Sequence, residues 1–308
     1  MSFEGAHGAA DGIESGVANG ELTRAAMTSQ PEWLRSVPTD RRFPDAKLLF
    51  TGCGTSFHAA QTGGDAVQAL ELVLRPRREA DVLVCVSHEG ETALTLEAAQ
   101  AWPGEAWLIT GKAESSLAAA CNEVVVCTPA IEESWCHTAS YTAAVSAIAS
   151  LNGEDTAWLS GAVDETLAAP PLPVSDHGRW LVAGAARDWP TAQEAVLKLR
   201  EGAYVAAEAH ETEQLLHGYL AAVDESVRAF VLEGEGRGAE RARQAVAALE
   251  AIGAQVTLVP TRHPVVDIVQ FQRLTVDLAE HRGVDPDRIR RHDERWAAAA
   301  AAASTSLD

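Results

Sequence analysis

The sequence predicts an α/β protein with two doubly wound domains, each a parallel sheet flanked by helices. Three observations lead to this prediction. Short apolar runs of strand length alternate with segments of helical periodicity along most of the chain. The alternation stops at a proline-rich segment near the middle and then restarts. The chain has 308 residues, which is enough for two ordinary domains.

The first half of the chain begins with a small, polar segment, residues 1–18, which we expect to be frayed. A helical pattern follows at 19–37 and ends before a proline. The first α/β unit then consists of strand 47–52, helix 57–74, strand 81–87, helix 92–102, strand 106–110, helix 115–121, strand 123–128 and helix 136–151. Such alternation is typical of a parallel sheet with covering helices.

The second half repeats this layout after the breaker run at 169–173, which suggests an internal duplication. Its predicted elements are strand 179–185, a helix through the stretch that starts at Glu194, strand 227–234, helix 238–252, strand 255–259 and helix 265–281. Within the stretch from Glu194, Val196, Leu199, Ala203 and Ala207 have helical spacing and are expected to face the core. The predicted organisation is an N-terminal helical segment (1–45), a first domain (46–155), a linker (156–178), a second domain (179–285) and a C-terminal tail (286–308) whose alanine run is expected to fray.

Composition excludes several classes of function. The net charge of −20 makes nucleic acid and anionic membrane surfaces poor partners, because both require the opposite charge. No apolar run approaches the ~20 residues that span a bilayer, and the N-terminus lacks the pattern of a secretory signal. The five cysteines include no Cys-x-x-Cys pair, so we expect a cytoplasmic protein without a disulfide framework.

The stretch 194–220 carries the groups best suited to acid–base chemistry. Lys198 and Glu201 are three residues apart and therefore neighbours on one helix face, and His217 follows after a polar turn. A carboxylate, an amine and an imidazole close together can move protons on a small polar substrate. The alternative is a surface ion pair with no catalytic role.

Two glycine-containing loops follow neighbouring predicted strands, at 52–56 and 87–92. Ligands bind beyond the carboxyl ends of parallel strands, and helix N-termini with hydroxyl side chains attract anions. Ser56 and Thr92 could instead only cap helices. The glycine pattern lacks the remaining features of a dinucleotide site and the Walker lysine, so no cofactor is predicted. His58, His88 and His137 lie near this site without metal-ligand spacing, so no metal is predicted either.

Five segments in order resemble blocks of a known family. The segments at 52–56, 87–92 and 132–142 resemble successive blocks of the sugar isomerase (SIS) domain, as in the isomerase half of glucosamine-6-phosphate synthase and in stand-alone SIS aminosugar-phosphate deaminases and isomerases. The stretch 194–220 resembles the matching block of a second SIS domain, and 29–34 resembles the segment before the first. The resemblance covers residues 28–290.

The resemblance implies two SIS domains and a homodimer with a sugar site near the interface. Glu201 would be the base that moves a proton between C1 and C2 of the open-chain sugar, with Lys198 beside the sugar. His217, contributed across the dimer, would help to open the ring. The residues that would bind the substrate and its phosphate are Gly54, Thr55, Ser56, Ser87, His88, Thr92 and Thr138.

The sequence also departs from the family. Glu89 replaces a hydroxyl residue where a phosphate should rest, and either His88 partly offsets its charge or Glu89 points away from the site. The segment between Ser56 and Ser87 is shorter than the family's and could lack a strand. The segment 288–295 holds no counterpart of the family's Schiff-base lysine. No glutaminase domain precedes residue 28, so we expect an incomplete synthase.

The function predicted from these residues is that of a phosphosugar-binding aldose–ketose isomerase or aminosugar-phosphate deaminase. One alternative is a non-catalytic module that binds a carbohydrate derivative. Another is an isomerase of an unphosphorylated sugar, since the phosphate loop is altered. A third is a synthase subunit that takes ammonia from a separate partner.

Overall fold

The chain folds into two four-stranded parallel sheets, as described by a computed structural model for residues 19–77 and 79–304. The first sheet has the order β1-β2-β3-β4, with β1 (Leu48–Thr51), β2 (Val82–Val86), β3 (Glu105–Thr110) and β4 (Glu123–Val126). The second has the order β6-β5-β7-β8, with β5 (Arg179–Gly184), β6 (Ala206–Glu211), β7 (Val227–Leu232) and β8 (Gln255–Val259). The predicted fold class is therefore confirmed.

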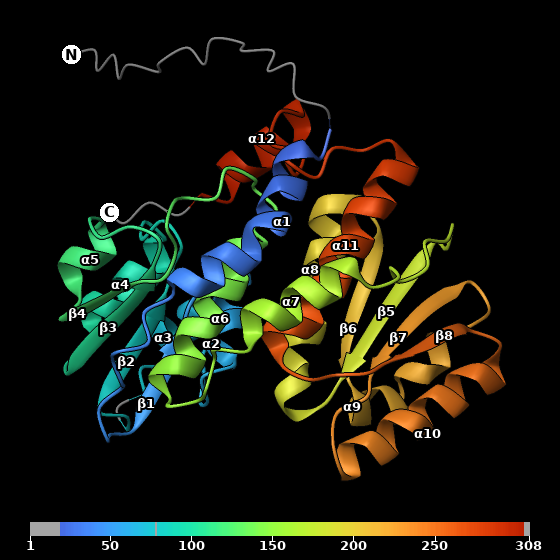
Figure 1. Cartoon of the computed structure of the whole chain (residues 1–308), viewed down its shortest axis with the longest axis horizontal. Coiled ribbons are helices and arrows are strands. Elements are labelled where there is room, and N and C mark those ends of the chain that lie inside the picture. The colour runs from blue at the N-terminus through green and yellow to red at the C-terminus, as the bar shows by residue number, and fades with distance from the viewer. Residues whose placement is uncertain (1–18, 78, 305–308) are drawn as a thin grey trace.

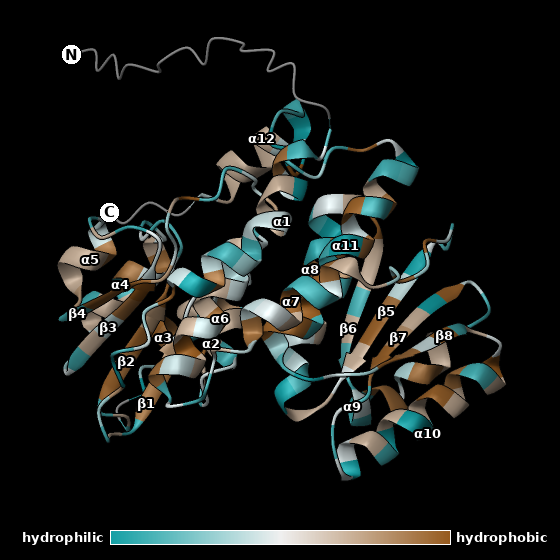
Figure 2. Ribbon diagram, viewed as in Figure 1, coloured by the Kyte–Doolittle hydropathy of each residue, from teal (hydrophilic) through white to brown (hydrophobic). Residues whose placement is uncertain are grey.

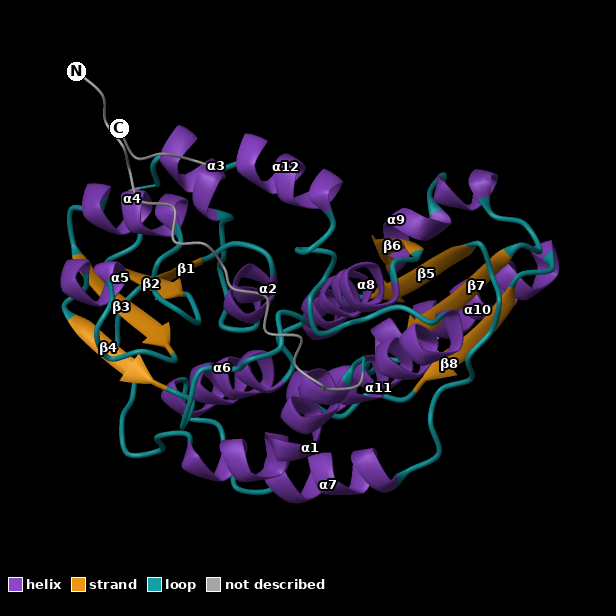
Figure 3. Ribbon diagram, turned by 90° about the horizontal axis from the view of Figure 1, so that it is seen from above, coloured by secondary structure: helices purple, strands orange, loops and turns teal. Residues whose placement is uncertain are grey.

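The two sheets stand apart, and a layer of helices fills the space between them (Figure 1, Figure 3). This layer consists of α2 (Thr55–Gln61), α6 (Ala139–Leu151), α8 (Trp189–Ala203) and α11 (Pro264–Arg282), on which α1 (Glu21–Ser36) and α7 (Leu159–Ala168) pack. The outer faces of the sheets are covered by α3 (Ala69–Leu74), α4 (Ala93–Ala101), α5 (Ser116–Ala120), α9 (Thr212–Leu216) and α10 (Arg237–Ile252). The last helix is α12 (Glu294–Ala302), and short 3₁₀ turns lie at Ala186–Asp188 and Tyr219–Ala222.

Burial on both faces explains why the central strands are continuous apolar runs. Every residue of β2 and β7 is buried, as expected for parallel strands with helices on both sides. The strands accordingly form the most hydrophobic part of the ribbon in Figure 2. One apolar cluster runs from Phe50 in the first sheet through the central helices to Phe230 in the second. Every residue of α6 is buried, which accounts for its small, apolar sequence.

The first helix continues through a proline with the help of a side chain. Pro31 lies inside α1 and has no N–H to donate to the carbonyl of Met27. Gln30 Nε2 donates to that carbonyl at 3.0 Å and also to Gln272 Oε1 of α11 at 2.9 Å. The same amide therefore repairs the helix and joins it to the central layer.

The predicted helix 57–74 is wrong, because the segment 62–68 separates α2 from α3. A Cβ atom on Gly63 would lie 2.4 Å from the Phe50 ring, so the chain passes close to β1 here. Phe50 donates its N–H to Asp65 O and accepts from the N–H of Val67, which forms one parallel bridge on the edge of β1. In the described part of this shortened segment, a bridge stands in place of a full strand.

Two further expectations need correction. Strand β6 was not predicted: Tyr204 takes a left-handed conformation (φ 56°) that ends α8, so Ala207 lies on a strand and not on the helix. Part of the tail expected to fray forms α12. The predicted frayed start, residues 1–18, lies outside the described residues.

The predicted domain boundaries remain a prediction. Helix α7 lies inside the segment 156–178, which was predicted to be the linker.

Candidate active site

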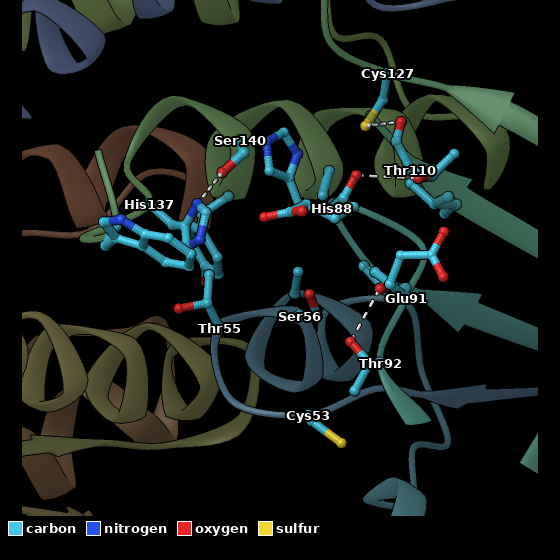
Figure 4. A pocket seen from close by; sticks show the side chains of 18 of the residues that line it. Cys53, Thr55, Ser56, His88, Glu91, Thr92, Thr110, Cys127, His137 and Ser140 are labelled. Atoms are coloured by element: carbon cyan, nitrogen blue, oxygen red, sulfur yellow. Dashed lines mark hydrogen bonds between the residues drawn. The ribbon is translucent and has the colours of Figure 1, made fainter. Parts of the chain in front are cut away.

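A cavity of about 360 Å³ lies at the carboxyl ends of β1, β2 and β3, beside the central helices (Figure 4). The predicted residue Ser56 lines it from the first turn of α2, and Ser87 and Thr92 line it from the loop that follows β2. Ser87 Oγ lies 3.1 Å from Thr92 Oγ1 and accepts the N–H of Gly90, which fixes the second loop. The Ser56 hydroxyl has no hydrogen-bond partner in the described part of the chain, so it is free for a ligand. Gly54 (φ 54°) lets the first loop turn into α2.

The predicted base reaches this cavity from α8. The carboxylate of Glu201 lines the cavity and is 28% exposed. Lys198 donates from Nζ to Glu201 Oε2 at 3.0 Å and to Thr55 Oγ1 at 3.1 Å. Lys198 is fully buried and does not line the cavity, whereas Thr55 does. The structure therefore places Lys198 behind Glu201, where it holds the carboxylate in position.

A second carboxylate, Glu194, joins α8 to α2 beneath the cavity. It is fully buried, with Oε2 2.7 Å from His58 Nδ1 and Oε1 3.4 Å from Lys198 Nζ. Thr55 Oγ1 also donates to it at 3.2 Å. The sequence placed His58 near the site, but Glu194 was missed, although its i,i+4 spacing with Lys198 was a usable signal.

Charge pairing keeps this buried network ionised. Burial by itself lowers the pKa of Lys198, but the carboxylates of Glu194 and Glu201 outweigh burial and raise the pKa above its usual value. Burial raises the pKa of Glu194, yet Lys198 and His58 bring it below the usual value. Lys198 therefore stays protonated near neutral pH, and a protonated amine is not a nucleophile.

Two imidazoles form a further wall of the cavity. The rings of His88 and His137 meet edge to face, with centroids 5.4 Å apart. His88 Nε2 accepts the N–H of Glu132 at 3.1 Å, so the His88 ring is neutral with its proton on Nδ1. Burial lowers the pKa of His88, against the opposing effects of Glu132 and Glu89. A neutral His88 brings no positive charge to Glu89.

Glu132 is the anchor of this wall and was missed as a site residue. Its buried carboxylate accepts the N–H and hydroxyl of Thr138 at Oε1 and the N–H and hydroxyl of Ser140 at Oε2. Four donors on one carboxylate fix the start of α6. Thr138, predicted to bind substrate, is buried, does not line the cavity and directs its hydroxyl to Glu132.

The acidic residues of the second loop have partners outside the cavity. Glu89 lines the cavity and pairs with Lys112 at 3.6 Å, with both side chains partly exposed. Glu91 accepts the N–H and hydroxyl of Ser116 at the start of α5, which lowers the pKa of Glu91. The sequence left open which group offsets the charge of Glu89, and in the structure this group is Lys112.

The segment before α12 passes over the cavity. Ile289 and Arg291 line it, and the Arg291 guanidinium lies 3.6 Å from the centre of the Trp135 ring. Trp135 donates its N–H to Asp287 O, which ties the two segments together. Sequence reasoning noted that this segment holds no lysine, but missed that it brings an arginine to the site.

His217 is the predicted residue that lies apart from the others. Its side chain is 73% exposed and lies 2.8 Å from Glu213 Oε1, one turn earlier on α9. This helix stands beside the second sheet, away from the cavity (Figure 1, Figure 3). The structure therefore does not bring His217 into the cavity with the other predicted residues.

Comparisons with known proteins identify relatives and neighbours over most of the chain. No family model matches the chain. The chain is 25% identical over 326 residues to the glutamine–fructose-6-phosphate aminotransferase (isomerizing) of Thermococcus kodakarensis, covering 86% of this chain and 54% of that protein. The chain therefore spans about half the length of the curated relatives it matches.

Solved structures have the same fold at low identity. The C-terminal domain of the aminotransferase from Francisella tularensis gives a TM-score of 0.73 at 20% identity, covering 90% of this chain and 99% of that one. A glucosamine-6-phosphate deaminase from Thermotoga maritima gives 0.70 at 19%, covering 87% and 97%. A tagatose-6-phosphate ketose/aldose isomerase from Escherichia coli gives 0.71 at 17%, covering 87% and 95%. The resemblance to the SIS family is confirmed.

Two features are absent from residues 19–77 and 79–304. No group of three or more His, Cys, Asp or Glu residues there is arranged to hold a metal ion. None of the helices within 19–77 and 79–304 is long and apolar enough to cross a membrane.

Proposed function

We propose that this chain is a phosphosugar-binding enzyme, an aldose–ketose isomerase or aminosugar-phosphate deaminase, with Glu201 as its base. The observation that carries the proposal is a single one: a carboxylate held by a buried ammonium enters a cavity lined by loop hydroxyls. The names of the similar proteins, an aminotransferase, a deaminase and a ketose/aldose isomerase of sugar phosphates, support the substrate class.

The isomerisation needs one base for the two carbons and a proton exchange at the two oxygens. Glu201 takes the proton from C2 of the open-chain aldose, the C2–H electrons form the C1–C2 double bond, and the C1=O electrons move to O1, which takes a proton from solvent water. Glu201 then returns its proton to C1 while the O2–H proton passes to solvent water and O2 becomes the carbonyl of the ketose. One carboxylate placed over two adjacent carbons carries both carbon transfers, and Lys198 holds that carboxylate through the 3.0 Å hydrogen bond.

The phosphate would rest on the loop hydroxyls. Ser56, Ser87 and Thr92 offer donors at the carboxyl ends of β1 and β2, and Thr55 lies beside them. Glu89 faces the same cavity, but its pairing with Lys112 reduces the repulsion of a phosphate.

Replacing Glu201 by Gln tests this proposal. We expect turnover of fructose 6-phosphate or glucosamine 6-phosphate to fall by about 10²–10⁴ while binding persists. The matched control is Glu208→Gln, since Glu208 is an exposed carboxylate of β6 in the other half. Turnover is measured by sugar interconversion and by ammonia release, which separates isomerase from deaminase. A Glu201→Gln variant as active as the unaltered protein would contradict the proposal.

We also propose that the chain acts as a homodimer in which His217 of one copy helps to open the sugar ring in the other. The support is its exposure at a distance from its own cavity. His217→Gln should slow turnover of cyclic sugars in a protein that sedimentation shows to be dimeric. A monomer with unchanged turnover would contradict this proposal.

A second candidate function is favoured by Glu89. A carboxylate on the cavity wall fits an unphosphorylated sugar, either as a substrate or as the ligand of a non-catalytic binding module. Sugar binding without turnover would favour the binding module.

A further inference from the structure

We infer that His137 selects the substrate by accepting, at Nε2, a hydrogen bond from a hydroxyl or amino group of the sugar. The inference deepens the proposed function and rests on it. His137 lines the cavity just before α6, and in Figure 4 it lies on one side of the cavity while Glu91 and Thr92 lie on the other. A sugar whose phosphate lies at the loop hydroxyls would bring its hydroxyl-bearing carbons towards His137.

The neighbours of His137 determine which of its nitrogens carries the proton. Ser140 Oγ donates its hydrogen to Glu132 Oε2 at 2.7 Å. A hydroxyl has one hydrogen, so Ser140 Oγ can only accept from His137 Nδ1, which lies 3.4 Å away. His137 therefore carries its proton on Nδ1, and Nε2 presents a lone pair.

That lone pair has no competitor within the protein. Nε2 of His137 has no hydrogen-bond partner among residues 19–77 and 79–304, and the ring borders the cavity. The backbone of His137 is held at φ 40°, a left-handed conformation that non-glycine residues rarely take. Strain of this kind persists where the surroundings fix a functional group, here through Glu132 and the start of α6.

The surroundings also keep the ring neutral. Burial lowers the pKa of His137 to about 4, with Lys198 and His88 acting in the same direction and Glu132 and Glu194 opposing. A neutral imidazole that presents a lone pair accepts from O–H and N–H groups and has no donor for a phosphate. This end of the cavity therefore fits a hydroxyl or a protonated amine of the sugar.

Binding measurements with paired variants test the inference. His137→Phe keeps a ring and removes the acceptor, whereas His137→Gln keeps an acceptor near the position of Nε2. Dissociation constants are measured for glucose 6-phosphate, glucosamine 6-phosphate and monodeoxy glucose 6-phosphates. We expect His137→Phe to weaken binding at least tenfold, to lose discrimination against one deoxy sugar, and to be partly rescued by His137→Gln. Comparison of the amino sugar with glucose 6-phosphate separates an amine donor from a hydroxyl donor.

The outcomes separate this inference from the proposed function. If the unaltered protein binds sugar phosphates and His137→Phe binds and discriminates equally well, the inference is overturned and the proposed function stands. If the unaltered protein binds none of them, both fail. Nitrogen-15 NMR of the free protein adds an independent measurement, since the inference requires the neutral Nδ1–H form of His137 at pH 7, and the Nε2–H form would overturn it.

Discussion

In the first sheet the turn after β1 carries Ser56, whereas in the second sheet the turn after β5 carries Asp188. Both residues stand four positions after a glycine that packs against the following turn: a Cβ on Gly52 would lie 3.0 Å from Ser56 O, and one on Gly184 2.7 Å from Asp188 O. The close packing of a glycine against the turn that follows the strand therefore occurs in both halves. The side chain at its end differs, being a free hydroxyl in one and a buried carboxylate in the other.

Because of this difference in side chain, the position has different surroundings in the two halves. Asp188 accepts a hydrogen bond from Thr261 at 3.3 Å, and burial raises its pKa. The Asp188 carboxylate is therefore buried and bonded within the protein, whereas Ser56, at the equivalent position in the first half, borders an open cavity. The second half contributes instead through α8, which brings Glu194, Lys198 and Glu201 to the first half's site.

The largest effect is expected where the halves meet. Lys198→Met leaves the buried carboxylate of Glu194 without its ammonium, and removing one partner of a buried pair costs about 3–5 kcal/mol. The matched control is Arg228→Met in β7. Arg228 is equally buried but bonds to Gln255 O and Thr257 Oγ1, so its loss should cost about 1–3 kcal/mol. Urea unfolding measures both.

The double variant Lys198→Met/Glu194→Met sharpens this comparison. It removes both charges together and should recover part of the lost free energy of unfolding. Equal destabilisation by Lys198→Met and Arg228→Met, without recovery in the double variant, would contradict the account of a charged junction.

Two buried carboxylates of the second half, Glu194 at the junction and Asp267 away from it, should make opposite contributions to the pH dependence of stability. Glu194 has a lowered pKa in the folded chain, so its contribution is present above its unfolded pKa and is lost on acidification. Burial raises the pKa of Asp267, near Asp188, to about 7 from 3.8, so its effect on stability becomes unfavourable as pH rises from about 4 to about 7. Asp267→Asn should raise the free energy of unfolding at pH 8 relative to pH 4. If Asp267→Asn left the change in the free energy of unfolding between pH 4 and pH 8 as it is in the unaltered protein, the raised pKa of Asp267 would be contradicted.

A smaller effect distinguishes two glycines. Gly63→Ala places a methyl group against the Phe50 ring beside β1 and should destabilise the chain by about 1–3 kcal/mol. Gly161 lies on the exposed side of α7 with open space around it, so Gly161→Ala should stabilise by up to about 1 kcal/mol. Thermal unfolding compares the two variants, and a stabilised Gly63→Ala variant would show that this segment does not need its close approach to β1.

The sequence predicted the fold class and most strands because buried parallel strands are continuous apolar runs. Strand β6 escaped because Ala206–Glu211 alternates small and charged residues next to a helix, and a left-handed Tyr204 leaves no mark in the sequence. For the site, too, only the parts that local motifs specify were predicted. The hydroxyl residues and Glu201 belong to such motifs, and folding brings them to one cavity.

The remaining site residues depend on contacts across the fold. The motif at 132–142 placed His137 near the site, but neither the hydrogen bonds of Glu132 nor the approach of Arg291 follows from any local spacing. Burial of Lys198 likewise depends on how α8 packs on α2, which a helical pattern alone does not specify.

The most direct test of the central claim is a thermal-shift titration with fructose 6-phosphate, glucosamine 6-phosphate and the corresponding free sugars. A ligand at 100 times its dissociation constant stabilises a fold by about 2.7 kcal/mol, which is readily measured. The account predicts that the phosphorylated sugars raise the melting temperature, that Ser87→Ala reduces the shift, and that Thr261→Val in the second half leaves it intact. No shift, a shift with free sugars alone, or a shift abolished by Thr261→Val would contradict a phosphosugar site in the first half.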